Sequence, residues 1–201
     1  SADKGTYEVI NPATEEILGH ASKATSTDVD KALKSAEKGL QIWKKTTPWD
    51  RSYILRRIAD KLREKKDVLA KWMTLENGKP LAEGVGETNG AADIFEWNAE
   101  ETKRIFGQTI ESRFEDTRVH VYYQPVGVVA ALSPWNFPLI LAARKISTAL
   151  AAGCSVIIKP DTITPGVVME LVDICRECGV PPGAINLLSG DPPSIASQLI
   201  Q

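Results

Sequence analysis

The second half of the chain, from Gly127 onward, repeats one pattern three times: a short, continuous apolar run followed by a segment with helical spacing. The apolar runs cover residues 128–132, 155–158 and 184–188, and the helical segments cover 139–152, 165–178 and 193 onward. Strands that are apolar at every position are typical of parallel sheets covered on both faces. The repeated strand–helix units therefore predict an α/β fold with a Rossmann-like, doubly wound parallel sheet.

The first half of the chain is mainly helical in pattern. Two short strands, 7–10 and 16–19, flank a turn-favouring Asn-Pro-Ala-Thr segment. The predicted helices are 26–44, capped by the Ser-Thr-Asp at its start, one long helix from Pro48 to the Asn-Gly-Lys-Pro at 77–80, and 87–106. Two further strands, 109–113 and 118–124, are predicted to form a hairpin.

Charge and cysteine content exclude several classes of protein. A net charge of -2 without long single-sign blocks does not fit a nucleic-acid binder. Three cysteines do not make a disulfide framework, and no secretory leader pattern opens the chain, so we expect a cytoplasmic protein. The longest apolar stretch, 137–152, contains Arg144 and Lys145 and is too short to span a bilayer, so no membrane role is expected.

Distinctive residues follow each of the three predicted parallel strands. They are Ser133, Pro134, Trp135 and Asn136 after the first, Lys159, Pro160, Asp161 and Thr162 after the second, and Gly190 and Ser194 after the third. Open α/β sheets bind ligands outside the carboxyl ends of their strands. We expect all three segments to lie along one rim, with a dinucleotide as occupant and its pyrophosphate held by free backbone N–H groups after Gly190.

Two of these residues allow a second interpretation. Asn136 either directs its side-chain amide at a developing oxyanion or caps the following helix. Lys159 either bonds ribose hydroxyls or a 2′-phosphate, or is simply solvated.

Other motifs give weaker signals. The glycine-rich run from Gly84 to Gly90 follows no strand and has one residue too many for a dinucleotide fingerprint. Cys175 and Cys178 have metal-site spacing but no second Cys or His pair, so they are interpreted as structural and no metal is expected.

Five ordered segments resemble the NAD(P)-dependent aldehyde dehydrogenase superfamily, most closely the succinate-semialdehyde dehydrogenases. They are residues 11–14, 74–80, 134–138, 149–154 and the Lys159-Pro160 loop, and the likeness covers nearly the whole chain. The resemblance implies that the Asn136 amide stabilises the oxyanion of a thiohemiacetal. It also implies that Ser133, Pro134 and Trp135 line the coenzyme, that Lys159 contacts the ribose, and that the helix after Gly190 faces the phosphates.

Two residues refine this resemblance. Many NAD-preferring relatives carry a glutamate where this chain has Thr162, which removes a charge that repels a 2′-phosphate, so we expect NADP to be accepted as well as NAD. Arg144 matches an arginine that grips the substrate carboxylate in succinate-semialdehyde enzymes, although it also fits a surface arginine. Asp161, Ala196 and the Pro192-Pro193 pair depart from the family pattern and leave the coenzyme preference open.

The predicted function is oxidation of a small aldehyde, such as succinate semialdehyde, to its acid. The family's nucleophilic cysteine and general-base glutamate lie further along a longer chain, so this chain is expected to be a truncated protein, inactive alone. The alternatives are a non-catalytic nucleotide-binding module and an aldehyde dehydrogenase for another semialdehyde or aldehyde. The expected organisation is N-terminal strands and helices at 1–106, an oligomerisation hairpin at 107–125 that supports a dimer or tetramer, and the βα units at 126–201.

Overall fold

The three apolar runs form one parallel sheet in a computed structural model that describes residues 5–200. The strands are β5 (Val128–Leu132), β6 (Ser155–Lys159) and β7 (Ile185–Leu187), adjacent in that order. The central strand β6 is buried at every residue because it has a strand on each edge and helices on both faces.

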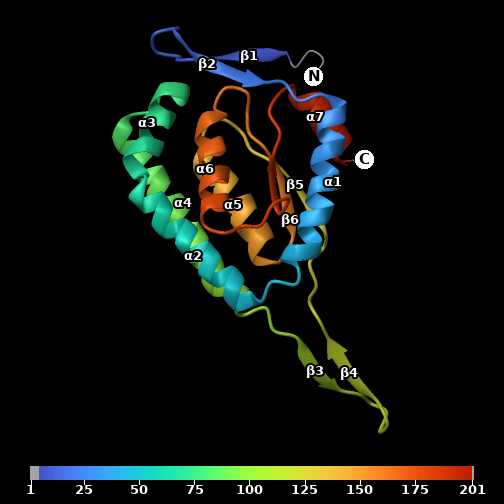
Figure 1. Cartoon of the computed structure of the whole chain (residues 1–201). Helices are drawn as coiled ribbons and strands as arrows, with labels where there is room; N and C mark the ends of the chain where they lie inside the picture. The colour runs from blue at the N-terminus through green and yellow to red at the C-terminus, as the bar shows by residue number, and fades with distance from the viewer. Residues whose placement is uncertain (1–4, 201) are drawn as a thin grey trace.

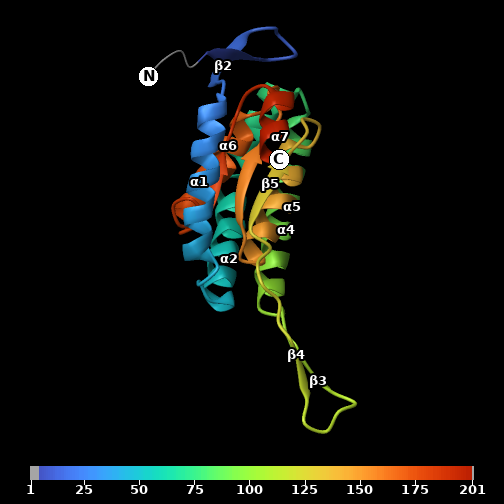
Figure 2. The same ribbon diagram turned by 90° about the vertical axis from the view of Figure 1, so that its right-hand side faces the viewer.

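Helices cover both faces of this sheet, which confirms the doubly wound α/β prediction (Figures 1 and 2). Helices α5 (Pro138–Ala151) and α6 (Gly166–Glu177) pack on one face, whereas α1 (Ser26–Trp43) and α7 (Pro192–Ile200) pack on the other. The side chains of β6 divide accordingly. Val156 and Ile158 belong to the larger apolar core, and Ile157 belongs to a smaller core beneath α1 and α7. This alternation follows from the two-residue period of a strand.

An outer layer of three helices lies on the far side of α5 and α6 from the sheet, at the left in Figure 1. Its members are α2 (Pro48–Glu64), α3 (Lys66–Asn77) and α4 (Leu81–Thr102). The single long helix predicted from Pro48 is wrong, because the chain breaks at Lys65. No glycine or proline marks this break. The Lys65 ammonium lies 3.8 Å from Glu170 and 3.6 Å from Glu177 of α6, so tertiary contacts accompany the bend.

The glycine-rich run lies inside α4, which begins before the predicted start at residue 87. A Cβ atom at Gly84 would come within 3.0 Å of the Ala70 Cα, so this glycine lets α3 and α4 pack closely. The predicted end of α3 is confirmed, since Gly78 adopts a left-handed conformation with φ of 79°. No helix within residues 5–200 has the length and apolar character needed to cross a membrane.

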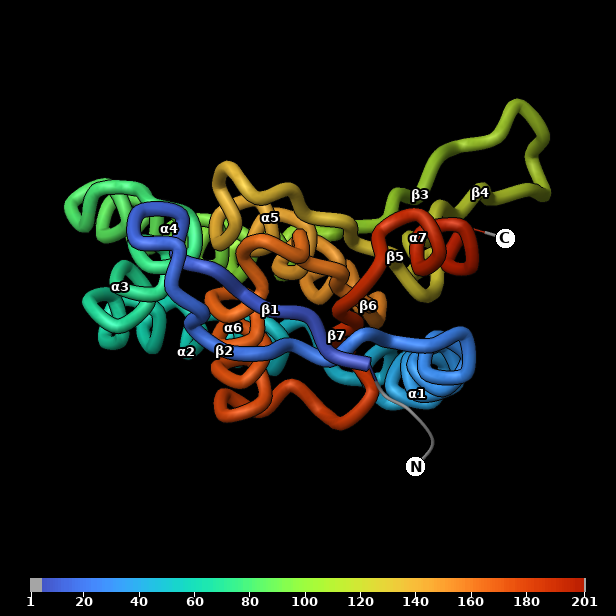
Figure 3. The backbone as a smooth tube through the Cα atoms, turned by 90° about the horizontal axis from the view of Figure 1, so that it is seen from above, coloured from blue at the N-terminus to red at the C-terminus, as the bar shows by residue number. Residues whose placement is uncertain are grey.

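Two antiparallel hairpins frame this body. The first pairs β1 (Thr6–Ile10) with β2 (Ile17–Ser22) and crosses above the carboxyl ends of the sheet strands (Figure 3). A capping box between Thr25 and Asp28, one residue before the predicted cap, then starts α1. The second hairpin pairs β3 (Gln108–Glu111) with β4 (Arg118–Val121) and projects away from the helices (Figures 1 and 2).

Candidate functional site

One cavity of about 270 Å³ is lined by residues at or just after the ends of β5 and β6 and by residues of α7, the helix that follows β7. Of the predicted site residues, its lining includes Ser133, Pro134, Lys159 and Asp161, and it adds Leu132, Pro192 and Ala196. The expected meeting of three segments at one edge is therefore present. The other predicted residues that follow the strands lie outside this lining: Trp135, Asn136, Pro160, Thr162 and Gly190 on the loops, and Ser194 in the first turn of α7.

Among residues 5–200, this cavity is lined by one buried hydroxyl without a partner and by a lysine without an ion pair. Ser133 is 6% exposed and its hydroxyl makes no hydrogen bond. Lys159 is 4% exposed as a residue, and its ammonium forms no ion pair within 4.0 Å among residues 5–200. Burial lowers the pKa of the Lys159 ammonium, and the nearby charges of Asp161 and Asp191 oppose this shift. Because buried polar groups are normally hydrogen-bonded, the pair fits a ligand with sugar hydroxyls or phosphate oxygens.

Asn136 lies between β5 and α5, and its side chain is exposed. Its amide makes no hydrogen bond within residues 5–200. The residue before α5 is Phe137, and no side chain of the loop caps the helix. The capping interpretation of Asn136 is therefore wrong, and its amide is free to donate to a ligand.

A buried glutamate from α4 occupies the N-terminus of α5 instead. The Glu87 Oε1 atom accepts from the backbone N–H groups of Leu139 at 2.9 Å and Ile140 at 3.1 Å. The other carboxylate oxygen pairs with the buried ammonium of Lys79. Lys79 also donates to the Asn136 carbonyl at 3.3 Å and lies 4.5 Å from the centre of the Phe137 ring. This ion pair thus joins α4 to the loop that carries Asn136.

A second buried glutamate occupies the N-terminus of α6. The Glu76 carboxylate accepts from Gly166 N–H at 2.8 Å and from Val167 N–H at 3.3 Å. Within residues 5–200 it forms no ion pair. Burial raises the pKa of the Glu76 carboxyl to about 7, against the lowering effect of these two backbone hydrogen bonds.

The start of α7 does not offer the free backbone N–H groups that the sequence analysis assigned to a pyrophosphate. Pro192 and Pro193 have no N–H, and the Ser194 N–H donates to the Asp191 carboxylate at 3.1 Å. The Ser194 hydroxyl donates to the Asp191 carbonyl. Gly190 adopts φ of 137°, so its backbone conformation accounts for the glycine. The structure therefore contradicts the expected pyrophosphate site on free N–H groups at the start of α7.

Glu76, Asn77, Lys79 and Glu87 were not singled out as functional by sequence reasoning. A signal was nevertheless present. Glu76 follows Leu69 and Met73 at helical spacing, and all three are buried, so a carboxylate sits within an apolar stripe. Buried carboxylates need partners, which flags such a residue for inspection.

Arg144 is exposed in α5, and its guanidinium makes no ion pair or hydrogen bond within residues 5–200.

The three cysteines of the chain lie in its interior. Cys154, Cys175 and Cys178 are free thiols buried in the core, and burial raises the pKa of both Cys175 and Cys178. Thiols in apolar surroundings are poor nucleophiles, which agrees with a structural interpretation of these residues.

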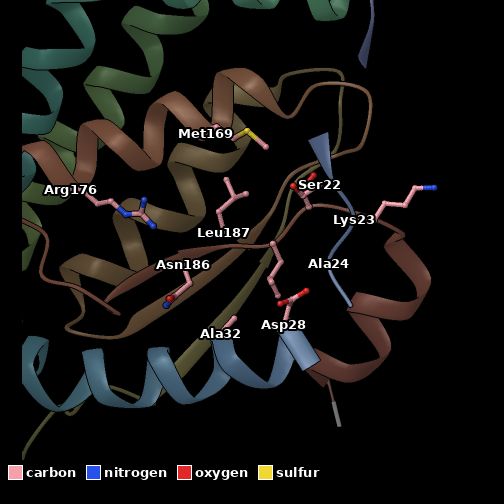
Figure 4. A pocket seen from close by; sticks show the side chains of 11 residues that line it. Ser22, Lys23, Ala24, Asp28, Ala32, Met169, Arg176, Asn186 and Leu187 are labelled. Carbon is pink, nitrogen blue, oxygen red and sulfur yellow. The ribbon is translucent and has the colours of Figure 1, made fainter. Parts of the chain in front are cut away.

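A larger cavity of about 420 Å³ lies beside β7, between α1 and α6 (Figure 4). Arg176 and Asn186 face this space, whereas Lys23 extends away from it (Figure 4). Arg176 pairs with Asp173 at 3.3 Å. None of the predicted site residues lines this cavity.

A doubly wound sheet with its polar site outside the strand ends is the arrangement in which open α/β proteins bind ligands. The sequence profile of the aldehyde dehydrogenase family matches residues 1–201, and the chain belongs to this family.

Relatives with known names agree with this assignment. The chain is 42% identical over 199 residues to glutarate-semialdehyde dehydrogenase of Pseudomonas putida, covering 98% of this chain and 42% of that protein. It is 41% identical over 192 residues to the NADP(+) succinate-semialdehyde dehydrogenase GabD of Escherichia coli, covering 96% and 40%. A crystal structure of aldehyde dehydrogenase from Brucella melitensis biovar abortus superposes with a TM-score of 0.97 at 38% identity, covering 99% and 41%. The chain thus spans about 40% of the length of relatives it matches.

Proposed function

We propose that this chain forms the coenzyme-binding edge of an NAD(P)-dependent dehydrogenase that oxidises a carboxylate-bearing aldehyde, such as succinate semialdehyde, to its acid. The observation that carries the proposal is the cavity at the strand ends, where the Ser133 hydroxyl is buried without a hydrogen bond and Lys159, a residue only 4% exposed, has no ion pair among residues 5–200. The names of the semialdehyde dehydrogenases among its relatives support the substrate class.

The residues of this chain have distinct roles in that reaction. The coenzyme, when bound, accepts a hydride from the substrate. Lys159 bonds the ribose, and the free amide of Asn136 donates to the oxygen that becomes negatively charged as a nucleophile attacks the carbonyl. The buried thiols of this chain do not suit that attack, so the nucleophile comes from a segment outside these residues. The full-length enzyme is therefore the active form, and the chain alone is inactive.

Arg144 is proposed to bind the substrate carboxylate, since its guanidinium has no protein partner within the described chain. In the full-length enzyme, Arg144→Ala should raise KM for succinate semialdehyde roughly 10- to 100-fold, as expected for a lost charge-assisted bond. Steady-state kinetics with butanal, which lacks the carboxylate, should change little. Arg176→Ala is the matched control. An unchanged KM for succinate semialdehyde in Arg144→Ala would contradict the proposed substrate. Coenzyme binding by a wild type that oxidises no aldehyde would favour a non-catalytic nucleotide-binding module.

Thr162 is proposed to permit NADP binding. It lies in the loop after β6, where a glutamate at the same position would repel the 2′-phosphate. Thr162→Glu in the full-length enzyme should lower kcat/KM for NADP by roughly 10-fold or more through repulsion of the 2′-phosphate. The value for NAD should be maintained. Equal effects on both coenzymes would contradict this role for the position.

The β3–β4 hairpin is proposed to be an oligomerisation arm of a dimer or tetramer. Its strands are exposed and carry apolar side chains such as Ile110 and Val119. Exposed strand edges of this kind pair with other chains. Ile110→Lys should therefore reduce the mass of the full-length protein in sedimentation, whereas Thr117→Lys in the turn should not. A full-length wild type that sediments as a monomer would contradict the proposed role of the β3–β4 hairpin.

A further inference from the structure

The loop that carries Asn136 is held by side chains from the corner between α3 and α4. The Asn77 side-chain amide donates to the Trp135 carbonyl at 3.0 Å, and the Lys79 ammonium donates to the Asn136 carbonyl at 3.3 Å. Two consecutive peptide groups are therefore fixed from outside the loop. The side-chain amide of Asn136 itself makes no hydrogen bond within residues 5–200.

From these contacts we propose that Asn77 and Lys79 are positioning residues for the oxyanion-stabilising amide of Asn136. The inference rests on the proposed function, because it assigns Asn136 that task. Neither residue needs to touch substrate. Each fixes the backbone from which the Asn136 side chain projects, and a displacement of about 1 Å at a reacting centre costs up to about 100-fold in rate.

Burial and charge make Lys79 a fixed donor. The residue is 9% exposed, pairs with Glu87 and lies over the Phe137 ring. Glu87 in turn accepts from the first N–H groups of α5. The loop is thus held at its carbonyls by Asn77 and Lys79 and at its exit into α5 by Glu87. Asn77 is half-buried, so its contact can be removed without opening the core.

A double-mutant cycle in the full-length enzyme tests this assignment, since coupled residues give non-additive effects. Asn77→Ala should lower kcat for aldehyde oxidation by roughly 10-fold with little change in KM. Asn136→Ala should lower kcat by about 100- to 1000-fold. In the double variant, Asn77→Ala should cause no further loss, because the amide it positions is gone. A general destabilisation would instead make Asn77→Ala lower kcat by the same factor in the wild type and in Asn136→Ala.

Amide hydrogen exchange supplies a readout that does not depend on turnover. In Asn77→Ala, exchange across residues 133–141 should become faster. Asn98→Ala is the matched control, because the Asn98 amide donates to Ser147 at 3.0 Å, away from the loop. Unchanged exchange and kcat in Asn77→Ala, or equal losses in both backgrounds of the cycle, would overturn the inference in an active enzyme. A wild type that oxidises no aldehyde would reject the proposed function itself.

Discussion

The N-termini of α5 and α6 are closed in the same way but with different electrostatics. Each helix follows a parallel strand, and each has its first N–H groups bonded to a buried glutamate from the α3–α4 region. Glu87 at α5 pairs with Lys79, whereas Glu76 at α6 has no cationic partner within residues 5–200. A helix N-terminus alone thus holds a carboxylate in place. Burial of that carboxylate without a counter-ion nevertheless raises the pKa of the Glu76 carboxyl.

The consequence differs for the two loops of the site. The Asn136 loop is tied to an ion pair that also contacts its backbone. The loop after Lys159 leads into a helix whose capping carboxyl changes protonation near pH 7. In both places the helix N-terminus is filled by the protein itself, as it is at α7 by Asp191.

The largest effect is expected from removing the cation at α5. Lys79→Met leaves the Glu87 carboxylate buried without its partner, which should lower the free energy of unfolding by about 3–5 kcal/mol. The double variant with Glu87→Gln should recover most of that loss, because no unpaired charge remains and the Gln oxygen still accepts from Leu139. Urea denaturation measures both. Equal stabilities of the single and double variants would remove the distinction between the two glutamates.

A smaller, pH-dependent effect is expected at α6. The folded pKa of Glu76 is about 7 against an ordinary 4.5, so its contribution to stability is complete below pH 4.5 and is lost as the pH rises through about 7. The shift corresponds to a loss on the order of 3 kcal/mol. Glu76→Gln should remove this loss, so the variant should gain stability relative to wild type between about pH 5 and about pH 8.

Urea denaturation across that pH range measures the gain. Glu83→Gln, at an exposed carboxylate of α4, is the control and should show no comparable trend. A constant difference between Glu76→Gln and wild type at every pH would show that Glu76 is not the titrating group.

The smallest effect concerns the space around Glu76. A Cβ atom at Gly166 would lie 2.5 Å from the Glu76 Oε1 and 3.0 Å from the Trp72 ring. Gly166→Ala should therefore lower stability by about 1–3 kcal/mol despite the better helix propensity of alanine. Gly86→Ala, where a Cβ meets nothing within 4 Å, should raise stability by about 0.5–1 kcal/mol. Thermal unfolding of both variants measures the contrast, and a stabilised Gly166→Ala would show that the carboxylate moves freely.

Much of the fold was predictable because its signals are local. The strand positions, the left-handed end at Gly78 and the antiparallel hairpins follow from short patterns. The break at Lys65 was not predictable, since no helix-breaking residue marks it. At the site, the meeting of Ser133 with Lys159 followed from parallel topology. The phosphate assignment at α7 failed because Pro192 and Pro193 have no N–H and the Asp191 carboxylate accepts from the Ser194 N–H, a contact that the sequence pattern does not show.

The sequence by itself determined a doubly wound α/β protein with polar loops gathered at one edge, because period, apolar runs and turn residues act over a few positions. Only the tertiary structure decided which carboxylates fill the helix N-termini. Glu76 lies 90 residues from the N–H of Gly166, and Glu87 lies 52 residues from that of Leu139. Such pairings depend on how helices pack across the layers, and no local pattern encodes them.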